Sequence, residues 1–278
     1  MRLRSTMVSV IKYIILTIFV FIIVIFPFWV VIINSGKTLV EANSLGIGLP
    51  SEWKFIENYK EVIIEGEFLV GLKNTIIITL FSSLIILFIS ALASWVFARS
   101  KLKFISFLYY ISISGILIPP AIITTIKVMK TLHIFGTCLG LILFYCGIFI
   151  PLAIFFMTGF IKTIPIELED SARVDGCSSF RIFIKIILPL LKPILITCSI
   201  FLVLNIWNNF IYPFYFLKNV DQWTLTLNLF NYASKFYHQA AWNLVFTGVI
   251  LVSTPLLIFF IFLQKRIVSG LLGGALKG

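Results

Sequence analysis

The charged side chains whose types and spacing best fit a chemical role lie in one internal segment, residues 162–192. Charged residues form only 12% of the sequence, and this segment stands between two long apolar runs. No His/Asp/Ser arrangement and no metal-ligand spacing accompanies the charges, so the pattern does not predict an enzyme. It indicates a surface that is presented to a partner. The charged residues at the centre of the segment are Glu167, Glu169, Asp170, Arg173, Asp175, Arg181 and Lys185.

A second polar pattern lies in the apolar run 193–217. Four residues follow the spacing i, i+3, i+4 and i+7: Asn205, Asn208, Asn209 and Tyr212. This spacing predicts that they share one face of a helix. Amides exchange hydrogen bonds with hydroxyl groups and aromatic rings pack against CH groups, so the face is a candidate pathway for a sugar-like solute. The alternative is that the Asn side chains bond to neighbouring helices, which contributes about 0.6–2 kcal/mol each.

Composition places the chain in a membrane. It is 60% hydrophobic and has long apolar runs that contain no charged side chain. The expected fold is an all-α polytopic membrane protein with six transmembrane helices. Residues 1–73 are expected to form an N-terminal anchor helix and an outer segment, and residues 74–278 a five-helix core that carries the loop 162–192. The six runs cover residues 13–33, 74–98, 104–126, 138–161, 193–217 and 240–263.

The distribution of basic residues indicates the orientation. Every arginine falls in the amino terminus, in alternate loops or in the carboxyl-terminal region, as the positive-inside rule expects for cytoplasmic segments. Both termini and the loop 162–192 are therefore expected in the cytoplasm. Lys127 and Lys130 run against this trend, so the end of the third run is the least defined boundary. The net charge of +11 does not predict nucleic acid binding, because it is spread over the segments that flank the apolar runs.

The loop itself reads as two helices joined by a tight turn. Pro165 suits the first turn of a helix and the acidic residues that follow suit its positive end, so a helix is expected over 165–174. Asp175 and Gly176 predict a turn, because glycine accepts a positive φ. Ser178 or Ser179 would cap a second helix that ends at Pro189. A solvated hairpin without a partner is the alternative, and the small residues at the bend favour docking.

These residues resemble the EAA-x3-G-x9-I-x-L-P loop of bacterial ABC importer permeases. The matching positions are Asp170-Ser171-Ala172, Gly176, Ile186 and Leu188-Pro189. Asp170 and Ser171 depart from the usual Glu and Ala. From about residue 70 onward, FARSKLK, ILIPP, LNIWNNFIYPF and QKRIVSGLLGGALKG are similar to the maltose-type, carbohydrate-uptake permeases.

The resemblance implies a type I ABC importer: two permeases, two cytoplasmic ATPase subunits and an extracytoplasmic solute-binding protein in a bacterial cell membrane. The second permease would be a homologous subunit. ATP and Mg would be used by the ATPase partner, because this sequence has no G-x4-G-K-[ST] phosphate loop and needs no cofactor of its own. The loop would form a cytoplasmic coupling helix that sits in a cleft of the ATPase. Its coupling residues would be Glu169, Asp170, Ser171, Ala172, Asp175 and Gly176.

Other solutes and functions remain as alternatives. A glycerol-phosphate-like solute would require Arg or Lys in the pathway, and the six apolar runs contain neither. A channel would require a polar or charged ring around a pore, which the sequence does not place.

Two further segments carry expectations. The tandem Pro119-Pro120 is the best candidate for a break in a membrane helix. The carboxyl-terminal residues 269–278 are too rich in glycine and small side chains for a packed helix. They are either a frayed tail or, as the resemblance implies, a segment that enters the ATPase dimer interface.

Overall fold

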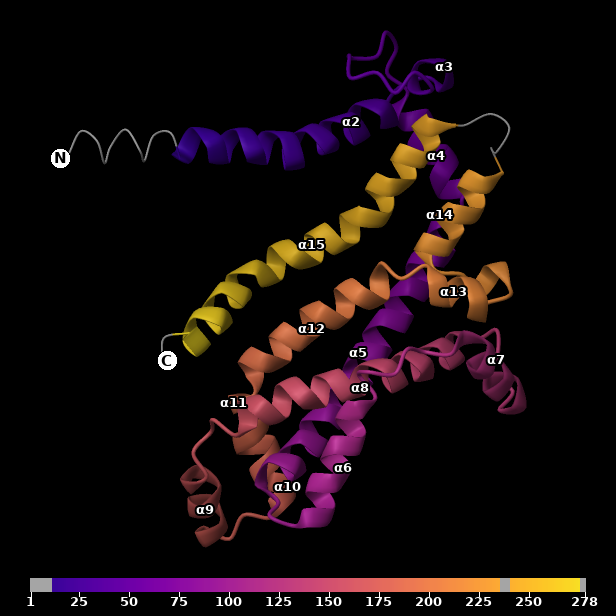
Figure 1. Cartoon of the computed structure of the whole chain (residues 1–278). Coiled ribbons are helices and arrows are strands. Elements are labelled where there is room, and N and C mark those ends of the chain that lie inside the picture. Colours follow the sequence, from indigo (N-terminus) through magenta and orange to yellow (C-terminus); the bar gives the residue numbers. More distant parts are fainter. Residues whose placement is uncertain (1–11, 236–240, 276–278) are drawn as a thin grey trace, which may run out of the picture. The chain divides into compact units, whose positions relative to one another are not determined.

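The structure is a computed structural model. It describes residues 12–235 and 241–275, with side chains up to residue 262. The described residues are helical and contain no strand, as the composition predicts (Figure 1). They form two compact units, one of residues 12–69 with 228–235 and 241–255, and the other of 70–227 with 256–275.

Four helices of the described chain are long and apolar enough to cross a membrane: Lys12–Ser35, Phe68–Arg99, Cys138–Ile161 and Trp242–Phe262. The helical pair Ser179–Leu190 and Lys192–Trp207, which is bent by 72°, is a fifth candidate. A membrane offers no water to backbone N–H and C=O groups, so apolar runs of this length satisfy them within helices. The expected third run, 104–126, does not form one continuous helix.

The first unit contains the N-terminal helix and the outer segment. Its elements are η1 (Phe21–Ile25), α2 (Phe26–Ser35), α3 (Leu39–Ala42), α4 (Phe55–Glu65) and parts of α14 (Leu225–Ser234) and α15 (Trp242–Ala275). The amide of Asn58 on α4 holds this unit together. It donates to the carbonyls of Ser35, at 2.8 Å, and Lys37, at 2.9 Å, and it accepts a bond from Asn243 at 3.0 Å. Asn58 is buried, so these bonds replace the water that it loses.

A carboxylate closes the loop between α3 and α4. Ser51 donates its backbone N–H, at 3.1 Å, and its hydroxyl to Glu41. These bonds hold the pKa of Glu41 below its usual range, because they stabilise the charged form.

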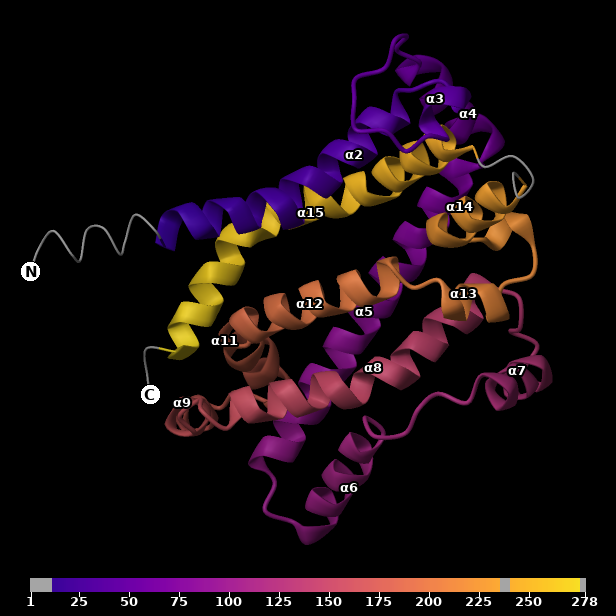
Figure 2. The ribbon, with the colours of Figure 1, turned by 45° about the horizontal axis from the view of Figure 1, so that its top comes forward.

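The second unit contains the loop and most of the membrane core. Its elements are α5 (Phe68–Arg99), α6 (Lys103–Ser114), α7 (Ile122–Thr131), α8 (Cys138–Ile161), α9 (Glu167–Val174), α10 (Ser179–Ile182), η2 (Phe183–Ile187), α11 (Leu188–Leu190), α12 (Lys192–Trp207), α13 (Ile211–Phe216) and η3 (Val220–Gln222). Helix α8 packs against both α6 and α12 (Figure 2).

Serine side chains show the register between α5 and α8. Ser94 donates to the carbonyl of Ile154 at 3.2 Å, and Ser90 lies 3.5 Å from the carbonyl of Ile150. Both residue numbers rise together, so the two helices run in the same direction. Residues 100–137 must therefore return along the whole length of α5 before α8 begins. The sequence predicts a membrane-crossing run, residues 104–126, between these two helices, and this agrees with their common direction.

That return is made by a broken path. Helix α6 covers only Lys103–Ser114 and α7 only Ile122–Thr131, so neither is long enough to cross a membrane alone. Pro119 and Pro120 lie between them. Proline disfavours helix in the residue before it and lacks an N–H, so two in succession interrupt the helical ladder. The break expected at this tandem is confirmed: the third run, 104–126, is divided between α6 and α7.

The carboxyl-terminal segment differs from the prediction. Residues 269–278 were expected not to form a packed helix, but α15 continues to Ala275, and residues 276–278 lie outside the described part of the chain. The helix continues from a strongly apolar segment, which supplies the nucleus that the small residues would lack by themselves.

Candidate functional site

The first arm of the loop is α9. Glu167, Glu169 and Asp170 lie in its first turn, where their negative charge is favoured by the helix dipole. Ser171 donates its hydroxyl to the carbonyl of Glu167 at 2.8 Å. The helix expected over 165–174 is confirmed from residue 167 onward.

Gly176 ends α9 in a left-handed turn. Its φ is 78°, and a side chain built there would meet no neighbour within 4 Å. The backbone angle therefore demands glycine, and available space does not. The N–H of Gly176 donates to the carbonyl of Arg173 at 3.0 Å, and that of Cys177 donates to the carbonyl of Ala172 at 2.9 Å. These two bonds form a Schellman motif and confirm the expected turn.

The second arm begins at Ser178 and ends one residue beyond Pro189. The Ser178 side chain accepts a bond from the backbone N–H of Arg181, at 3.4 Å, and so caps α10. The helix then widens into the π-helix η2 and continues through α11, which contains Pro189. The second helix, expected to end at Pro189, ends one residue later, at Leu190. The wider turn before the proline changes the hydrogen-bond pattern that a proline would otherwise clash with, and the chain bends after Leu190 instead.

Glu169 points into the protein. Its side chain has no exposed surface, and Arg99 Nε donates to Oε1 at 2.7 Å. The indole N–H of Trp95 donates to Oε2 at 3.0 Å. Both carboxylate oxygens are therefore bonded, as a buried charge requires. Glu169 was predicted among the coupling residues, and its geometry gives it an anchoring place in the loop.

The other predicted coupling residues divide into two groups. Ala172 is buried with Glu169, whereas Asp170, Ser171, Asp175 and Gly176 are exposed. The exposed Asp170 forms an ion pair with Arg173 at 2.7 Å.

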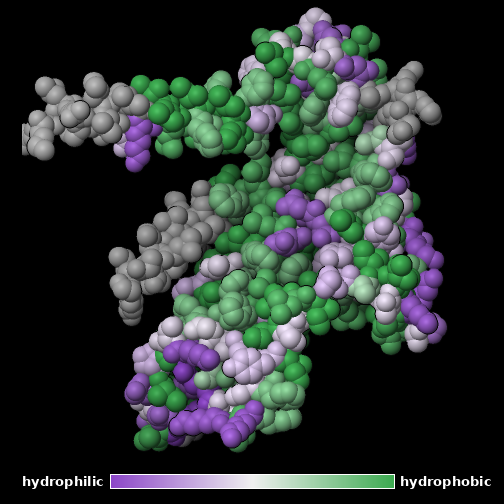
Figure 3. Space-filling view, viewed as in Figure 1, coloured by the Kyte–Doolittle hydropathy of each residue, from purple (hydrophilic) through white to green (hydrophobic). Residues whose placement is uncertain are grey.

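Two apolar side chains stand out on the same loop. Val174 is 88% exposed and Phe180 is 67% exposed. The surface around α9 and α10 is otherwise rich in hydrophilic residues, seen at the bottom of Figure 3. Single exposed apolar side chains are common on protein surfaces, so Val174 and Phe180 are candidate contact positions for a partner without forming a large apolar patch. The partner would cover Val174 and Phe180 while the charges around them set its orientation.

The partners of Glu169 were missed at the sequence level. Arg99 and Trp95 lie at the end of α5, about 70 residues earlier in the chain. The available signal was the segment FARSKLK, in which an arginine directly follows a long apolar run. Sequence spacing cannot show that this arginine meets the loop.

The predicted polar face of 205–212 is only partly formed. Helix α12 ends at Trp207 and α13 begins at Ile211, so the four residues do not share one helix. Asn209 accounts for the break, because its side chain accepts a bond from the backbone N–H of Tyr212 at 3.0 Å and competes with helical bonding. The expectation of one helical face was therefore wrong.

The same four residues have different surroundings. Asn205 and Asn208 are exposed, and their amides bond back to the carbonyls of Phe201 and Leu204 on their own helix. Tyr212 packs against Phe144, with ring centroids 4.7 Å apart. Asn205 and Asn208 are thus the exposed members of the four, whereas Asn209 and Tyr212 are half-buried.

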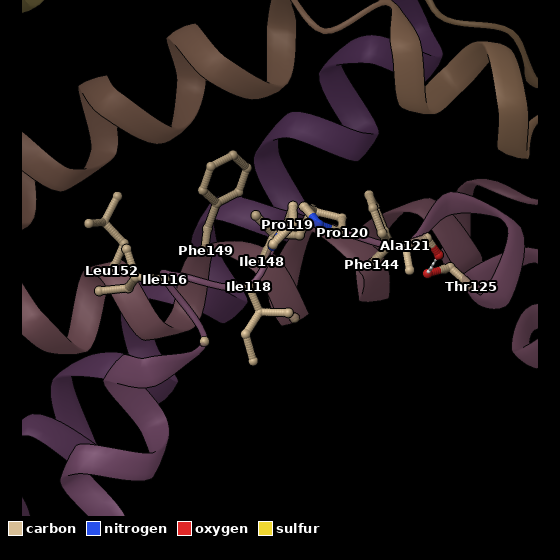
Figure 4. Close-up of a pocket in the computed structure, with 12 residues that line it drawn as sticks. Ile116, Ile118, Pro119, Pro120, Ala121, Thr125, Phe144, Ile148, Phe149 and Leu152 are labelled. Carbon is tan, nitrogen blue, oxygen red and sulfur yellow. Dashed lines mark hydrogen bonds between the residues drawn. The ribbon is translucent and has the colours of Figure 1, made fainter.

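An apolar hollow of about 600 Å³ lies between the linker after α6 and helix α8 (Figure 4). Thr125 supplies a hydroxyl to its lining, and this hydroxyl already donates to the carbonyl of Ala121 at 2.9 Å. A sugar requires many hydrogen bonds, so the hollow does not suit it. The lining residues are Gly115, Ile116, Ile118, Pro119, Pro120, Ala121, Thr125, Phe144, Gly147, Ile148, Phe149 and Leu152.

The arrangement of apolar helices around a helix–turn–helix loop defines a permease subunit. Residues 2–272 match the family of binding-protein-dependent transport system inner membrane components, and the chain belongs to that family. It is a membrane transport component of an ABC importer, not an enzyme. Membership implies that it works with an ATPase and a solute-binding protein. The resemblance seen in the sequence is therefore confirmed.

Individual relatives agree with this assignment. The chain is 34% identical to the "Probable starch degradation products transport system permease protein AmyC" of Thermoanaerobacterium thermosulfurigenes, over 90% of this chain and 91% of that protein. It is 31% identical to the "Melibiose/raffinose/stachyose import permease protein MelC" of Bacillus subtilis, over 91% of each chain. Its fold matches a chain of a bacterial ABC transporter that imports the acidic polysaccharide alginate. The TM-score is 0.81 at 19% identity, over 94% of this chain and 97% of the other.

We expect Asn209→Leu to lower the thermal stability of the purified protein, because the N–H of Tyr212 loses its acceptor and a lost bond of this kind costs about 0.5–1.5 kcal/mol. The measurement is a melting curve in detergent. Asn219→Leu is the matched control, because Asn219 is exposed on a nearby segment. Equal melting temperatures for Asn209→Leu and the unchanged protein would contradict the capping role.

Proposed function

We propose that this chain is the permease subunit that moves a sugar or oligosaccharide across the membrane after a solute-binding protein has delivered it. The coupling loop carries the proposal, because its helix, left-handed turn and helix present an exposed bend to a partner. Relatives named for starch products and for melibiose, raffinose and stachyose support a carbohydrate over a glycerol-phosphate-like solute.

The ATPase would contact the exposed side of the loop. That side offers the carboxylates of Asp170 and Asp175 together with the apolar side chains of Val174 and Phe180. Gly176 keeps the bend free of a side chain, so an ATPase cleft could close around it. The same geometry suits two ATPase subunits, one for each permease, with ATP and Mg held by them.

The solute path would run past Asn205 and Asn208. Two exposed amides are too few to surround a sugar, so a second, homologous permease would face this helix and complete the path.

The orientation follows from the direction of the helices and the basic residues. Helices α5 and α8 both end beside the coupling loop. Arginine is concentrated at that end and in the terminal segments, so we place the loop and both termini in the cytoplasm. The segment that contains Ser51 then lies outside.

We expect Gly176→Pro to abolish uptake while the subunit still inserts into the membrane. Proline cannot take a φ of 78°, and it removes the N–H that bonds to Arg173. Asp175→Lys should have the same effect through a reversed charge at the bend. Uptake and solute-stimulated ATP hydrolysis in proteoliposomes are the measurements. Normal values of both in the two variants would rule out the loop as the coupling element.

A labelling experiment tests the orientation. Single cysteines at Ser51 and Ser179, in a protein whose four native cysteines are replaced by serine, should react with a membrane-impermeant maleimide from opposite sides. Ser51 should react in intact cells and Ser179 only after the membrane is opened. Both positions are exposed, so reaction of both from the same side would overturn the proposed topology.

The pathway role of α12 is tested by Asn208→Leu. The Asn208 side chain is exposed and bonds only to its own helix in the described contacts, so its loss should leave the melting temperature unchanged. Sugar uptake should fall by about 2- to 13-fold, as expected for one lost hydrogen bond to solute in the pathway. Leu204→Ile on the same helix is the matched control. Unchanged uptake in both Asn205→Leu and Asn208→Leu would remove this pair from the pathway.

A further inference from the structure

Arg99 joins two separate points of the coupling loop to the last turn of α5. Its Nε donates to Glu169 within α9, and its Nη2 donates to the carbonyl of Ile164, before α9 begins, at 2.8 Å. Only 15% of the arginine side chain is exposed. The planar guanidinium can make both bonds at once because its donors form a rigid fork.

Trp95 extends this attachment to the second arm. It lies one turn before Arg99, and its indole N–H bonds to Glu169. Its ring lies against that of Phe183 in η2, with ring centroids 5.7 Å apart and the planes tilted by 33°. Phe183 is fully buried and also makes a T-shaped contact with Phe88, with ring centroids 6.4 Å apart. Both arms of the loop are thus held by the same end of α5.

The buried charges make this attachment stiff. A buried ion pair gains little over an apolar contact of the same size, but the removal of one partner leaves an uncompensated charge and is strongly unfavourable. Arg173 on α9 also lies 3.6 Å from Glu169 Oε2, so separation of the loop from α5 would leave Glu169 with this longer, half-exposed ion pair in place of its two bonds to α5. The exposed bend, in contrast, has no such bond to α5 among the described contacts, so a force on the bend reaches the membrane helix through this attachment.

We propose that Arg99, Trp95 and Glu169 form a clamp that makes α5 move together with the coupling loop during each transport cycle. The three are positioning residues: they transmit a displacement and do not themselves touch the ATPase or the solute. This inference rests on the proposed docking of the loop to an ATPase.

A distance measurement tests the clamp in the protein with its native side chains at all three positions. Spin labels are placed at Glu167→Cys on α9 and Val96→Cys on α5, which are both exposed. The labelled subunit is assembled with its second permease, ATPases and binding protein in nanodiscs. We expect one narrow distance distribution with the same mean in the nucleotide-free and ATP-bound states. A mean that differs between the two states would overturn the clamp.

Variants test its role in transport. Arg99→Lys keeps the charge but lacks the fork, and Glu169→Gln keeps hydrogen bonds but lacks the charge. Both should lower the amount of sugar imported per ATP hydrolysed by roughly 2- to 30-fold, the range for mutations within a coupling network. Both should also broaden the distance distribution, while subunit composition stays intact. Lys101→Gln, at an exposed position two residues beyond Arg99, is the matched control and should behave as the unchanged protein.

A charge-free pair separates positioning from general damage. Arg99→Gln with Glu169→Gln leaves no stranded charge and should recover part of the loss seen in Arg99→Gln alone. Unchanged import per ATP in Arg99→Lys and Glu169→Gln, or loss of the ATPases from their complexes, would overturn the clamp. Suppose that the clamp variants behave as the unchanged protein. If Gly176→Pro also left uptake unchanged, the proposed docking of the loop to an ATPase would be contradicted as well. If Gly176→Pro abolished uptake, the docking would stand and the clamp alone would be contradicted.

Discussion

The structure depends on one constraint: within a bilayer, each backbone N–H and C=O must find a partner inside the protein. Long helices meet this constraint through their own backbone hydrogen bonds. Where α5 and α8 touch, the hydroxyl groups of Ser90 and Ser94 contact backbone carbonyl groups of α8. The two interrupted segments meet it differently. At 208–210 the side chain of Asn209 accepts a hydrogen bond in place of a helical carbonyl group. At 116–121 two prolines have no backbone N–H, so two donors that would need an acceptor are absent.

The coupling loop is under a different constraint. It lies outside the apolar membrane-spanning segments, where charged side chains are tolerated, but it must still be attached to an apolar core. Its amphipathic first helix turns Glu169 and Ala172 inward and leaves Asp170 and Asp175 outside. The inward carboxylate is neutralised by an arginine from the end of a membrane helix. The loop is thereby held rigidly at Glu169 and exposed at its bend, a combination that suits the transfer of motion between subunits.

The sequence predicted those parts of the fold and site that depend on local chemistry. Helix α9, the positive φ of Gly176, the cap at Ser178 and the break at the tandem proline all follow from the preferences of residues close together in the chain. The shared helical face of Asn205 and Asn209 failed, because apolar composition says how much of a segment is buried but not whether its hydrogen-bond ladder is continuous. The pairing of Glu169 with Arg99 lay beyond prediction, since it depends on the packing of α5 against a loop 70 residues away.

The π-helix in the second arm gives the fixed length of the loop a geometric meaning. A π-turn holds one more residue than an α-turn over the same rise, so residues 183–187 carry an extra residue between the bend and α11. The π-turn absorbs this residue, so the residues on either side of it keep the orientation they would have in a plain α-helix one residue shorter. Insertion of a residue into α10, where no π-turn absorbs it, would instead rotate everything before it by about 100° about the helix axis. The bend at Gly176 would then point in a new direction. The number of residues between Gly176 and Phe183 thus sets the direction in which the bend points.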